Sequence, residues 1–444
     1  MSQLAGHFLG QALAKYFIVL SNNPSSTLSS AIQKLCVKLA DGHTCIDLEE
    51  IDDNQQPCSL EELRSALFYS GVVSAPGKIA PFILDEKNRF YFYRYYFYEQ
   101  RLSELLVKRI LQKPQVDKTR IRQLLDELFV SGQPWPNLQK VAAALAVTNQ
   151  FCIVTGGPGT GKTSTLTRII LLLLRFSDIP LNIKLAAPTG KAAQRMQESI
   201  RAQIISLHDP ERLPFGFPEK ASTIHSLLGA RSDGVSFYHD ANRPLECDVL
   251  IIDEASMIDV ALMYRIMEAL PLSSKLIIVG DPYQLASVEA GSVLTQLVDE
   301  GGFDFERVSD IEAMTGERVN PGTKPNFLSQ CHIALTQSYR FNEKSGIGKL
   351  CLSVNEGEFG KVKALLDDPV YSDISSLEWT GWSGLESFIF NGYKNYVETV
   401  MHGPSNLSEN IFKIFSEFRL ICAIRDGNQG VIGANTAIEN ILMH

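Results

Sequence analysis

The chain has 444 residues, of which 45% are hydrophobic and 20% charged, and its formal net charge is −9. This length exceeds one ordinary core, so two or three folded domains are expected. No segment reaches the roughly 18 unbroken apolar residues that cross a bilayer, and no charged region precedes the first apolar stretch as in a secretory signal. The eight cysteines are scattered without a C-x-x-C pair, which argues against a zinc site or a disulfide framework and favours the cytoplasm.

Residues 1–115 are expected to form a small, mostly helical N-terminal domain. Its most unusual feature is the aromatic run from Phe90 to Tyr98. The first half of this run suits a β-strand, because aromatic side chains favour half-buried pleated surfaces, and the second half passes into helical spacing. The run would either offer a stacking surface to bases, present a docking face to a partner, or close a small core. The pattern favours the core.

A local excess of basic residues overlaps the aromatic run. Between Lys87 and Arg122, ten Lys and Arg residues stand against three Asp and Glu residues, a net of +7. A DNA track needs only a local basic groove, so the overall charge of −9 does not exclude nucleic acid. The spacing alone favours the simpler interpretation, a solvated helix face.

Residues 116–136 are expected to be a linker, and residues 137–330 a folded α/β domain. The second region alternates apolar strands with amphipathic helices, which is typical of a parallel sheet with helices on both faces. The expected strands are residues 151–155, 183–187, 249–252 and 275–279. Each ends in a polar or glycine-rich turn, and open α/β sheets bind ligands at the carboxyl ends of their strands.

The turn after the first of these strands has the pattern of a phosphate-binding loop. Residues 156–163 fit G-x-x-x-x-G-K-[ST], follow a strand and open a helix. Glycines leave room for phosphate oxygens, and their N–H groups form an anion cradle with the helix N-terminus. Lys162 should reach the β- and γ-phosphates of ATP, and Thr163 should ligate Mg²⁺. The expected ATP-binding residues of this turn are Gly156, Gly157, Pro158, Gly159, Thr160, Gly161, Lys162, Thr163 and Ser164.

Two further turns carry polar residues suited to ATP hydrolysis. Asp253 and Glu254 follow the third strand, where Asp253 would hold Mg²⁺ and Glu254 would orient or deprotonate the attacking water. Two adjacent carboxylates repel each other unless cations compensate them, and Mg²⁺ with Lys162 would do so. Gln284 follows the fourth strand and is placed to sense the γ-phosphate. These three residues and Lys162 are the candidate catalytic residues.

Together these motifs resemble helicase superfamily 1, and its RecD branch in particular. The resemblance rests on Gly280-Asp-Pro-Tyr-Gln-Leu285, on Asp253-Glu-Ala-Ser256 before it and on Ser338-Tyr-Arg340 after it. It implies a RecA-like P-loop NTPase lobe, in which Gln139 reads adenine. It also implies that Arg340 is catalytic and reaches the γ-phosphate across a cleft between two lobes. The DNA contacts that it implies are Pro188, Thr189, Gly190, Lys191, Thr223 and His225.

For His225, the residue type alone favours a structural role. Only its place in the family motif indicates that it contacts DNA. The resemblance extends to the segments 89–99 and 421–435. It implies a cytoplasmic subunit that works with RecB and RecC on single- and double-stranded DNA ends. ATP hydrolysis would drive it 5′ to 3′ along one strand during double-strand break repair and recombination, with the N-terminal domain packed against RecC. Nothing in the chain resembles a nuclease carboxylate cluster.

Residues 331–444 are expected to begin a second RecA-like lobe that is truncated. Only 104 residues follow Arg340, and the family's later DNA-contacting and second-arginine motifs are missing. The isolated chain is therefore expected to bind nucleotide but to hydrolyse it poorly, because catalysis needs both walls of the cleft. Three alternatives stay open: a free-standing RecD-like helicase, the helicase part of a conjugative relaxase, and an inactive subunit that binds only ATP and partners. A P-loop ATPase that does not act on DNA is disfavoured by the Gly280–Leu285 motif and by Arg340.

Overall fold

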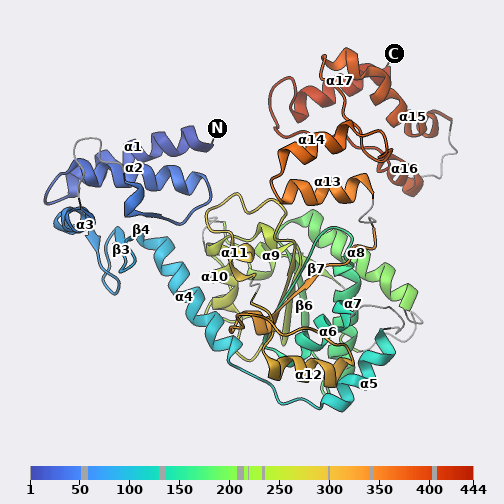
Figure 1. Ribbon diagram of the computed structural model, residues 1–444, viewed down its shortest axis with the longest axis horizontal. Coiled ribbons are helices and arrows are strands. Elements are labelled where there is room, and N and C mark those ends of the chain that lie inside the picture. Colours follow the sequence, from blue (N-terminus) through green and yellow to red (C-terminus); the bar gives the residue numbers. More distant parts are fainter. Residues whose placement is uncertain are drawn as a thin grey trace. The chain divides into compact units, whose positions relative to one another are not determined.

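The computed structural model describes residues 2–51, 59–129, 137–207, 215–218, 220–232, 236–298, 301–340, 345–402 and 408–443 (Figure 1). The chain divides into two units, Met1–Glu343 and Lys344–His444. The first unit contains all of the candidate site residues, so its sheet and the helices around it decide where those residues lie. The second unit is described separately below.

A six-stranded parallel sheet organises the first unit. Its strand order is β10-β5-β9-β8-β6-β7, and each neighbouring pair is parallel. The strands are β5 (Phe151–Gly156), β6 (Ile183–Ala187), β7 (Ala221–Thr223), β8 (Val249–Ile252), β9 (Lys275–Gly280) and β10 (His332–Leu335). The four predicted strands are confirmed. Their apolar, mostly β-branched residues are buried on both faces, as a parallel sheet between helices requires.

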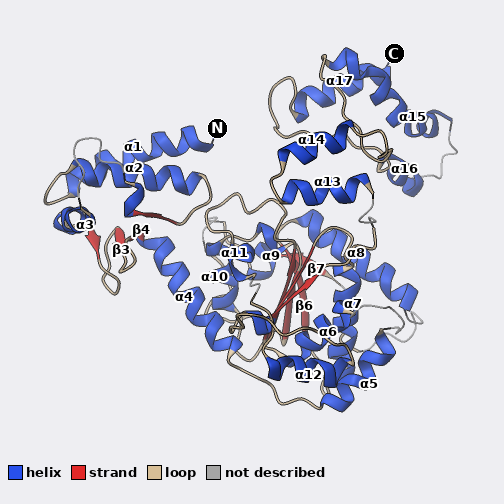
Figure 2. Ribbon diagram, viewed as in Figure 1, coloured by secondary structure: helices blue, strands red, loops and turns tan. Residues whose placement is uncertain are grey.

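Helices lie on both sides of the sheet (Figure 2), and alternate residues of the central strands belong to two different cores. Cys152 and Val154 of β5 join one core, whereas Phe151 and Ile153 join the other. The first core is covered by α5 (Lys118–Leu128), α6 (Leu138–Thr148), α7 (Lys162–Phe176), α8 (Gly190–Leu207) and α12 (Phe305–Thr315). The second is covered by α4 (Tyr93–Ile110), α9 (Ile224–Leu228), α10 (Val260–Ala269) and α11 (Val293–Leu297). The predicted α/β fold with helices on both faces is confirmed.

The N-terminal region combines helices with a small sheet. The helices are α1 (Ser2–Leu20), α2 (Ser26–Ala40) and α3 (Leu60–Tyr69), and the sheet has the order β1-β4-β3-β2. Its strands are β1 (Cys45–Asp47), β2 (Val73–Ser74), β3 (Phe82–Leu84) and β4 (Arg89–Phe92). The aromatic run changes from β4 to α4 at Tyr93, as predicted. Phe90, Tyr91 and Tyr95 are buried, so this run closes a core.

Helix α4 attaches the N-terminal region to the large sheet. Leu102 and Leu106 enter the second core, and Tyr98 stacks on Tyr264 of α10 with ring centroids 5.1 Å apart. Arg109, with 1% of its surface exposed, donates to the carbonyls of Leu270 (3.1 Å), Pro271 (3.0 Å) and Ser274. Burial lowers the pKa of Arg109 to about 10. The Arg109 guanidinium therefore fixes the segment between α10 and β9 by donating hydrogen bonds to its backbone carbonyls.

Arg109→Ala should lower the free energy of unfolding by about 2–4 kcal/mol, because it leaves carbonyls unpaired and opens a void. Arg101→Ala provides a control on the same helix. Arg101 pairs with Glu104 at 2.6 Å with a side chain 48% exposed, and its removal should change stability by less than about 0.5 kcal/mol. Urea denaturation followed by circular dichroism checks both values. Equal effects of the two substitutions would contradict a special role for Arg109.

The structure differs from two of the predicted domain boundaries. Part of the expected linker 116–136 is helix α5, whose Ile121 and Leu125 are fully buried against the sheet's first core. Those two residues recur at helical spacing, which is the physical reason that the segment folds; residues 130–136 lie outside the described residues. The sheet also continues beyond residue 330, because β10 pairs with β5.

Within the second unit, the described residues form helices and no β-strand. The helices are α13 (Gly346–Asn355), α14 (Phe359–Asp367), α15 (Glu386–His402), α16 (Ser408–Phe415) and α17 (Val431–Met443). The assignment of residues 331–444 to a second RecA-like lobe stays a prediction. Across both units, none of the helices in the described ranges is long and apolar enough to cross a membrane.

Candidate active site

The turn between β5 and α7 curls around the amine of Lys162. Gly159 and Gly161 adopt φ angles of 78° and 80°, a left-handed backbone that favours glycine, and Gly161 caps α7. Lys162 Nζ donates to the carbonyls of Gly156 (2.6 Å) and Gly157 (3.0 Å). The turn thus combines a helix N-terminus with a cation at its centre, which is the arrangement that binds phosphate.

The other residues of the turn are held by local hydrogen bonds. The hydroxyl of Thr160 donates to the carbonyl of Gly157 at 2.9 Å. Thr163 and Ser164 lie in the first turn of α7, where the hydroxyl of Ser164 accepts from the guanidinium of Arg168. The predicted phosphate-binding residues therefore form one continuous turn at the carboxyl end of β5.

The acidic pair lies at the carboxyl end of β8. The amide of Asp253 donates to the carbonyl of Ala186 at 3.0 Å, and the Asp253 carboxylate accepts from the amide of Glu254 at 2.9 Å. Burial raises the pKa of Asp253 to about 6; the charge of Glu254 also raises it, while the charge of Lys162 lowers it. Strands β5 and β8 both pair in parallel with β9, so the turns that carry Lys162 and the acidic pair lie at the same edge of the sheet.

The chemistry of this pair fits Mg²⁺ bound together with phosphate. No group of three or more His, Cys, Asp or Glu side chains that could hold a metal occurs among the residues that the structure describes. Mg²⁺ is commonly held by one or two carboxylates together with substrate phosphates. A half-buried carboxylate beside a second one, with Thr163 at the start of α7, matches that donor set. Glu254 also has φ 54° and ψ 41°, an uncommon conformation for a residue with a side chain.

Asp253→Asn is expected to stabilise the nucleotide-free chain at neutral pH. The pKa of Asp253 in the folded chain is raised from 3.8 to about 6. Stability from the protonated carboxyl is therefore complete below about pH 4 and is lost as the pH rises through 6. The shift corresponds to roughly 2–3 kcal/mol at about pH 7.5. Thermal unfolding at about pH 7.5 and pH 5 checks this; an equal gain at both would rule out the Asp253 charge as the cause.

Gln284 lies in the turn after β9, next to the acidic pair in the sheet order. Asp281, at the start of this turn, is buried, and its carboxylate accepts from the amide of Tyr283 at 3.1 Å and from Nε2 of Gln284 at 3.4 Å. The 3₁₀ helix η3 (Ala255–Met257), which follows the acidic pair, packs against β9. The Gln284 side chain is exposed at the same sheet edge as the P-loop.

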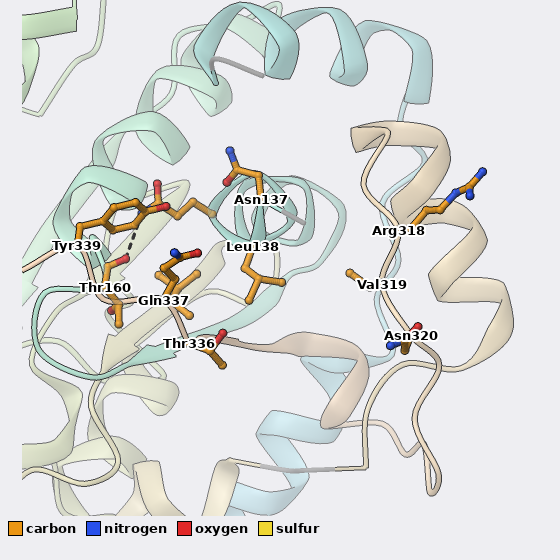
Figure 3. A pocket seen from close by; sticks show the side chains of 11 residues that line it. Asn137, Leu138, Thr160, Arg318, Val319, Asn320, Thr336, Gln337 and Tyr339 are labelled. Atoms are coloured by element: carbon orange, nitrogen blue, oxygen red, sulfur yellow. Dashed lines mark hydrogen bonds between the residues drawn. The ribbon is translucent and has the colours of Figure 1, made fainter. Parts of the chain in front are cut away.

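A cavity of about 320 Å³ opens beside the P-loop (Figure 3). Gln139, at the start of α6, lines it and donates from Nε2 to the carbonyl of Thr160 at 3.0 Å. Tyr339 and Thr160 lie on one side of the cavity and Arg318, Val319 and Asn320 on the other. This position, next to a phosphate-binding turn and with an amide at its wall, suits the base of a nucleotide.

Some of these cavity residues were not singled out from the sequence. Tyr339 belongs to the Ser338-Tyr-Arg340 motif, so its place in the sequence could have indicated a position near the nucleotide. Residues 318–320 lie in a loop after α12 that carries no motif, and no local pattern marks them.

Arg340 belongs to the first unit, together with the P-loop. It follows β10, whose Leu335 is in register with Gly156 of β5. The arginine is exposed, and the amide of the preceding Tyr339 donates to the carbonyl of Gly159 in the P-loop.

The residues predicted to contact DNA lie at the other end of the same sheet edge. Ala187 of β6 is in register with Thr223 of β7, so the turns that follow them are neighbours. Pro188, Thr189, Gly190 and Lys191 follow β6. The Thr189 hydroxyl accepts from the amide of Ala192 at 3.2 Å, and the Thr223 hydroxyl accepts from the amide of Ser226 at 3.1 Å.

Two exposed side chains stand at this end of the edge. Lys191 opens α8, and His225 lies with its ring 5.8 Å from that of Phe237. The strands β9 and β8 separate these turns from the P-loop. One sheet edge therefore carries the phosphate turn, the acidic pair and the predicted DNA contacts in spatial order.

Comparison with known proteins agrees with these motifs. A family model described as an AAA domain matches residues 139–290, which run from Gln139 past Gln284. The RecBCD enzyme subunit RecD of Haemophilus influenzae is 34% identical over 387 residues, covering 81% of this chain and 60% of that protein. The RecBCD enzyme subunit RecD of Mycolicibacterium smegmatis is 28% identical over 441 residues, covering 97% of this chain and 72% of that protein. The chain is a homologue of these RecD subunits over most of its length.

The chain spans 60% of the length of the Haemophilus relative. A third relative, the ATP-dependent RecD2 DNA helicase of Deinococcus radiodurans, is 36% identical over 214 residues. That match covers 48% of this chain and 26% of the Deinococcus protein. The match to the RecD subunits therefore covers more of this chain than the match to the RecD2 helicase does.

Proposed function

We propose that this chain is the ATP-binding motor part of a DNA helicase and a subunit of a RecBCD-type helicase–nuclease. The observation that carries the proposal is the single sheet edge on which the P-loop, the Asp253–Glu254 pair and the Thr189 and Thr223 turns follow one another. A phosphate cradle beside carboxylates supports nucleoside triphosphate hydrolysis. The further turns lie at the same edge of this sheet, so their positions can change as hydrolysis proceeds.

In this proposal the P-loop residues bind the triphosphate of ATP. Lys162 exchanges the carbonyls of Gly156 and Gly157, which it contacts now, for the β- and γ-phosphate oxygens. The amides of the turn, from Gly157 to Thr163, surround the phosphates, and the cavity at Gln139 and Tyr339 takes the adenine base. The amide of Gln139 can pair with the N6 and N7 positions of adenine, which favours ATP over other nucleotides.

Hydrolysis would take place between the P-loop and the acidic pair. Thr163 and Asp253 would hold Mg²⁺, which neutralises charge on the phosphates when bound. Glu254 orients the attacking water and takes its proton. Gln284 contacts the γ-phosphate, and the guanidinium of Arg340 stabilises the charge that develops on it.

DNA would lie across the turns after β6 and β7. Lys191 is exposed and suited to a backbone phosphate, and the hydroxyls of Thr189 and Thr223 lie in adjacent turns. His225 is the remaining proposed DNA-contacting residue of these turns. In this account, nucleotide-dependent movement of the acidic and Gln284 turns is passed along the sheet to these contacts, and the chain advances 5′ to 3′ on one strand.

The names of the relatives, subunits of a RecBCD enzyme, support a role with RecB and RecC. We extend the proposal to a role of that assembly at DNA ends in double-strand break repair and recombination. The RecD relatives match 81% and 97% of this chain, whereas the RecD2 helicase matches 48%. This difference favours a subunit over a free-standing helicase. Co-purification of the tagged chain with RecB and RecC tests the partnership; a chain that stays alone would support the free-standing alternative.

ATP hydrolysis with and without single-stranded DNA tests the motor function. DNA is expected to stimulate hydrolysis, and Lys191→Ala should raise the DNA concentration for half-maximal stimulation about fivefold, because one phosphate contact is lost. Lys184→Ala, at an exposed lysine within β6, is the control and should change nothing. Hydrolysis that is insensitive to DNA would count against a helicase.

A further inference from the structure

The segment that follows β10 is clamped onto the P-loop by two hydrogen bonds. The amide of Tyr339 donates to the carbonyl of Gly159 at 2.8 Å, and the hydroxyl of Ser338 donates to the carbonyl of Pro158 at 3.2 Å. Consecutive residues of one segment therefore bind consecutive carbonyls of the other. Such a paired contact fixes both the position and the direction of the segment.

Arg340 follows this clamp directly. A β-carbon on Gly159 would overlap the β-carbon of Arg340 and lie 2.9 Å from the Ser338 hydroxyl, so the two backbones approach as closely as glycine permits. The φ angle of Gly159 is +78°, which also favours glycine. The first carbons of the Arg340 side chain therefore rest on the turn that would surround the phosphates.

We propose that Ser338 is a positioning residue for ATP hydrolysis: its hydrogen bond to Pro158 aims Arg340 at the γ-phosphate. This inference rests on the proposed function, in which Arg340 stabilises the transition state. The arginine is then held by the P-loop of its own unit, and its aim depends on the conformation of that loop. A guanidinium has to lie close to its optimal place, since a displacement of about 1 Å can lower a rate a hundredfold.

Ser338 is the part of the clamp that substitution can remove, because the bond from the Tyr339 amide survives any side-chain change. Without the bond from Ser338 to Pro158, the segment can pivot about Tyr339 while staying attached to the P-loop. The binding of nucleotide should then be retained, since Lys162 and the backbone amides are unaffected.

The test compares Ser338→Ala, Ser338→Thr and Arg340→Ala, alone and combined. Ser338→Ala should lower kcat about tenfold and change the dissociation constant for an ATP analogue less than about twofold. Ser338→Thr keeps the hydroxyl and should restore most of the rate. In an Arg340→Ala background, Ser338→Ala should have no further effect, because there is no guanidinium left to aim.

Ser177→Ala is the matched control, since Ser177 also donates its hydroxyl to a carbonyl, that of Ile179 at 2.7 Å, but lies beyond the far end of α7. It should leave kcat unchanged. Thermal melting of each variant verifies that it folds. An equal effect of Ser338→Ala with and without Arg340, or a loss of affinity that matches the loss of rate, would overturn the inference. If Arg340→Ala itself leaves turnover unchanged, the proposed role of Arg340 fails instead, whatever Ser338 does.

Discussion

Glu254→Gln should leave nucleotide binding intact and lower the rate of ATP hydrolysis by about 10²- to 10⁴-fold, the usual contribution of a general base. Glutamine has nearly the shape of glutamate but cannot accept the proton of the attacking water. The P-loop would be unaffected, because Lys162 and the glycine turn do not depend on Glu254 for any of their hydrogen bonds. Phosphate release under saturating ATP and DNA gives the rate, and titration with a fluorescent ATP analogue gives the affinity.

The matched control for this prediction is Glu246→Gln, at an exposed glutamate just before β8, at the opposite edge of the sheet. Its rate and affinity should equal those of the unchanged protein. If Glu254→Gln hydrolyses ATP at the normal rate, Glu254 is not the base. A simultaneous loss of binding would instead indicate that the Glu254 turn is needed to build the nucleotide site.

Lys162→Ala should weaken the binding of ATP by roughly a hundredfold, since hydrogen bonds to charged groups contribute about 1.5–3 kcal/mol. The substitution removes the cation at the centre of the P-loop, so both the attraction to the phosphates and two bonds to loop carbonyls are lost. The pKa of Asp253 should also rise further, because the charge of Lys162 lowers it. Isothermal titration with ATP and with adenosine separates the phosphate contribution from that of the base.

Adenosine affinity should change little in Lys162→Ala, because the cavity at Gln139 and Tyr339 does not include the amine. Lys184→Ala, on an exposed part of β6, controls for a general loss of positive charge. Unchanged ATP affinity in Lys162→Ala would remove the main support for a nucleotide site in this turn.

The central strands and the polar turns at their carboxyl ends could be predicted from the sequence, because their signals are local. Four or five apolar residues followed by glycine or acid define β5, β8 and β9, and parallel pairing then brings their turns together. Strand β7 gave no such signal, because it has only three residues, all partly exposed, and Ala221 is the one apolar residue among them. Its place at the sheet edge depends on tertiary pairing with β6.

The segments that could not be predicted owe their positions to distant parts of the chain. Helix α5 has an apolar stripe at Ile121, Leu125 and Leu128, but the turn-forming residues around it suggested a linker. Arg109 looked like one basic residue among many, and only the packing of α4 brings it to three carbonyls after α10. The wall of the base cavity at residues 318–320 likewise comes from a loop without a motif.

A structure of the chain with Mg²⁺ and a non-hydrolysable ATP analogue would test the central claim most directly. The account predicts that the phosphates lie against the amides of the turn from Gly157 to Thr163, with Lys162 Nζ on phosphate oxygens, Asp253 at the metal, and the base between Gln139 and Tyr339. An analogue bound elsewhere, or bound with Lys162 still on the carbonyls of Gly156 and Gly157 and Asp253 away from the metal, would contradict it.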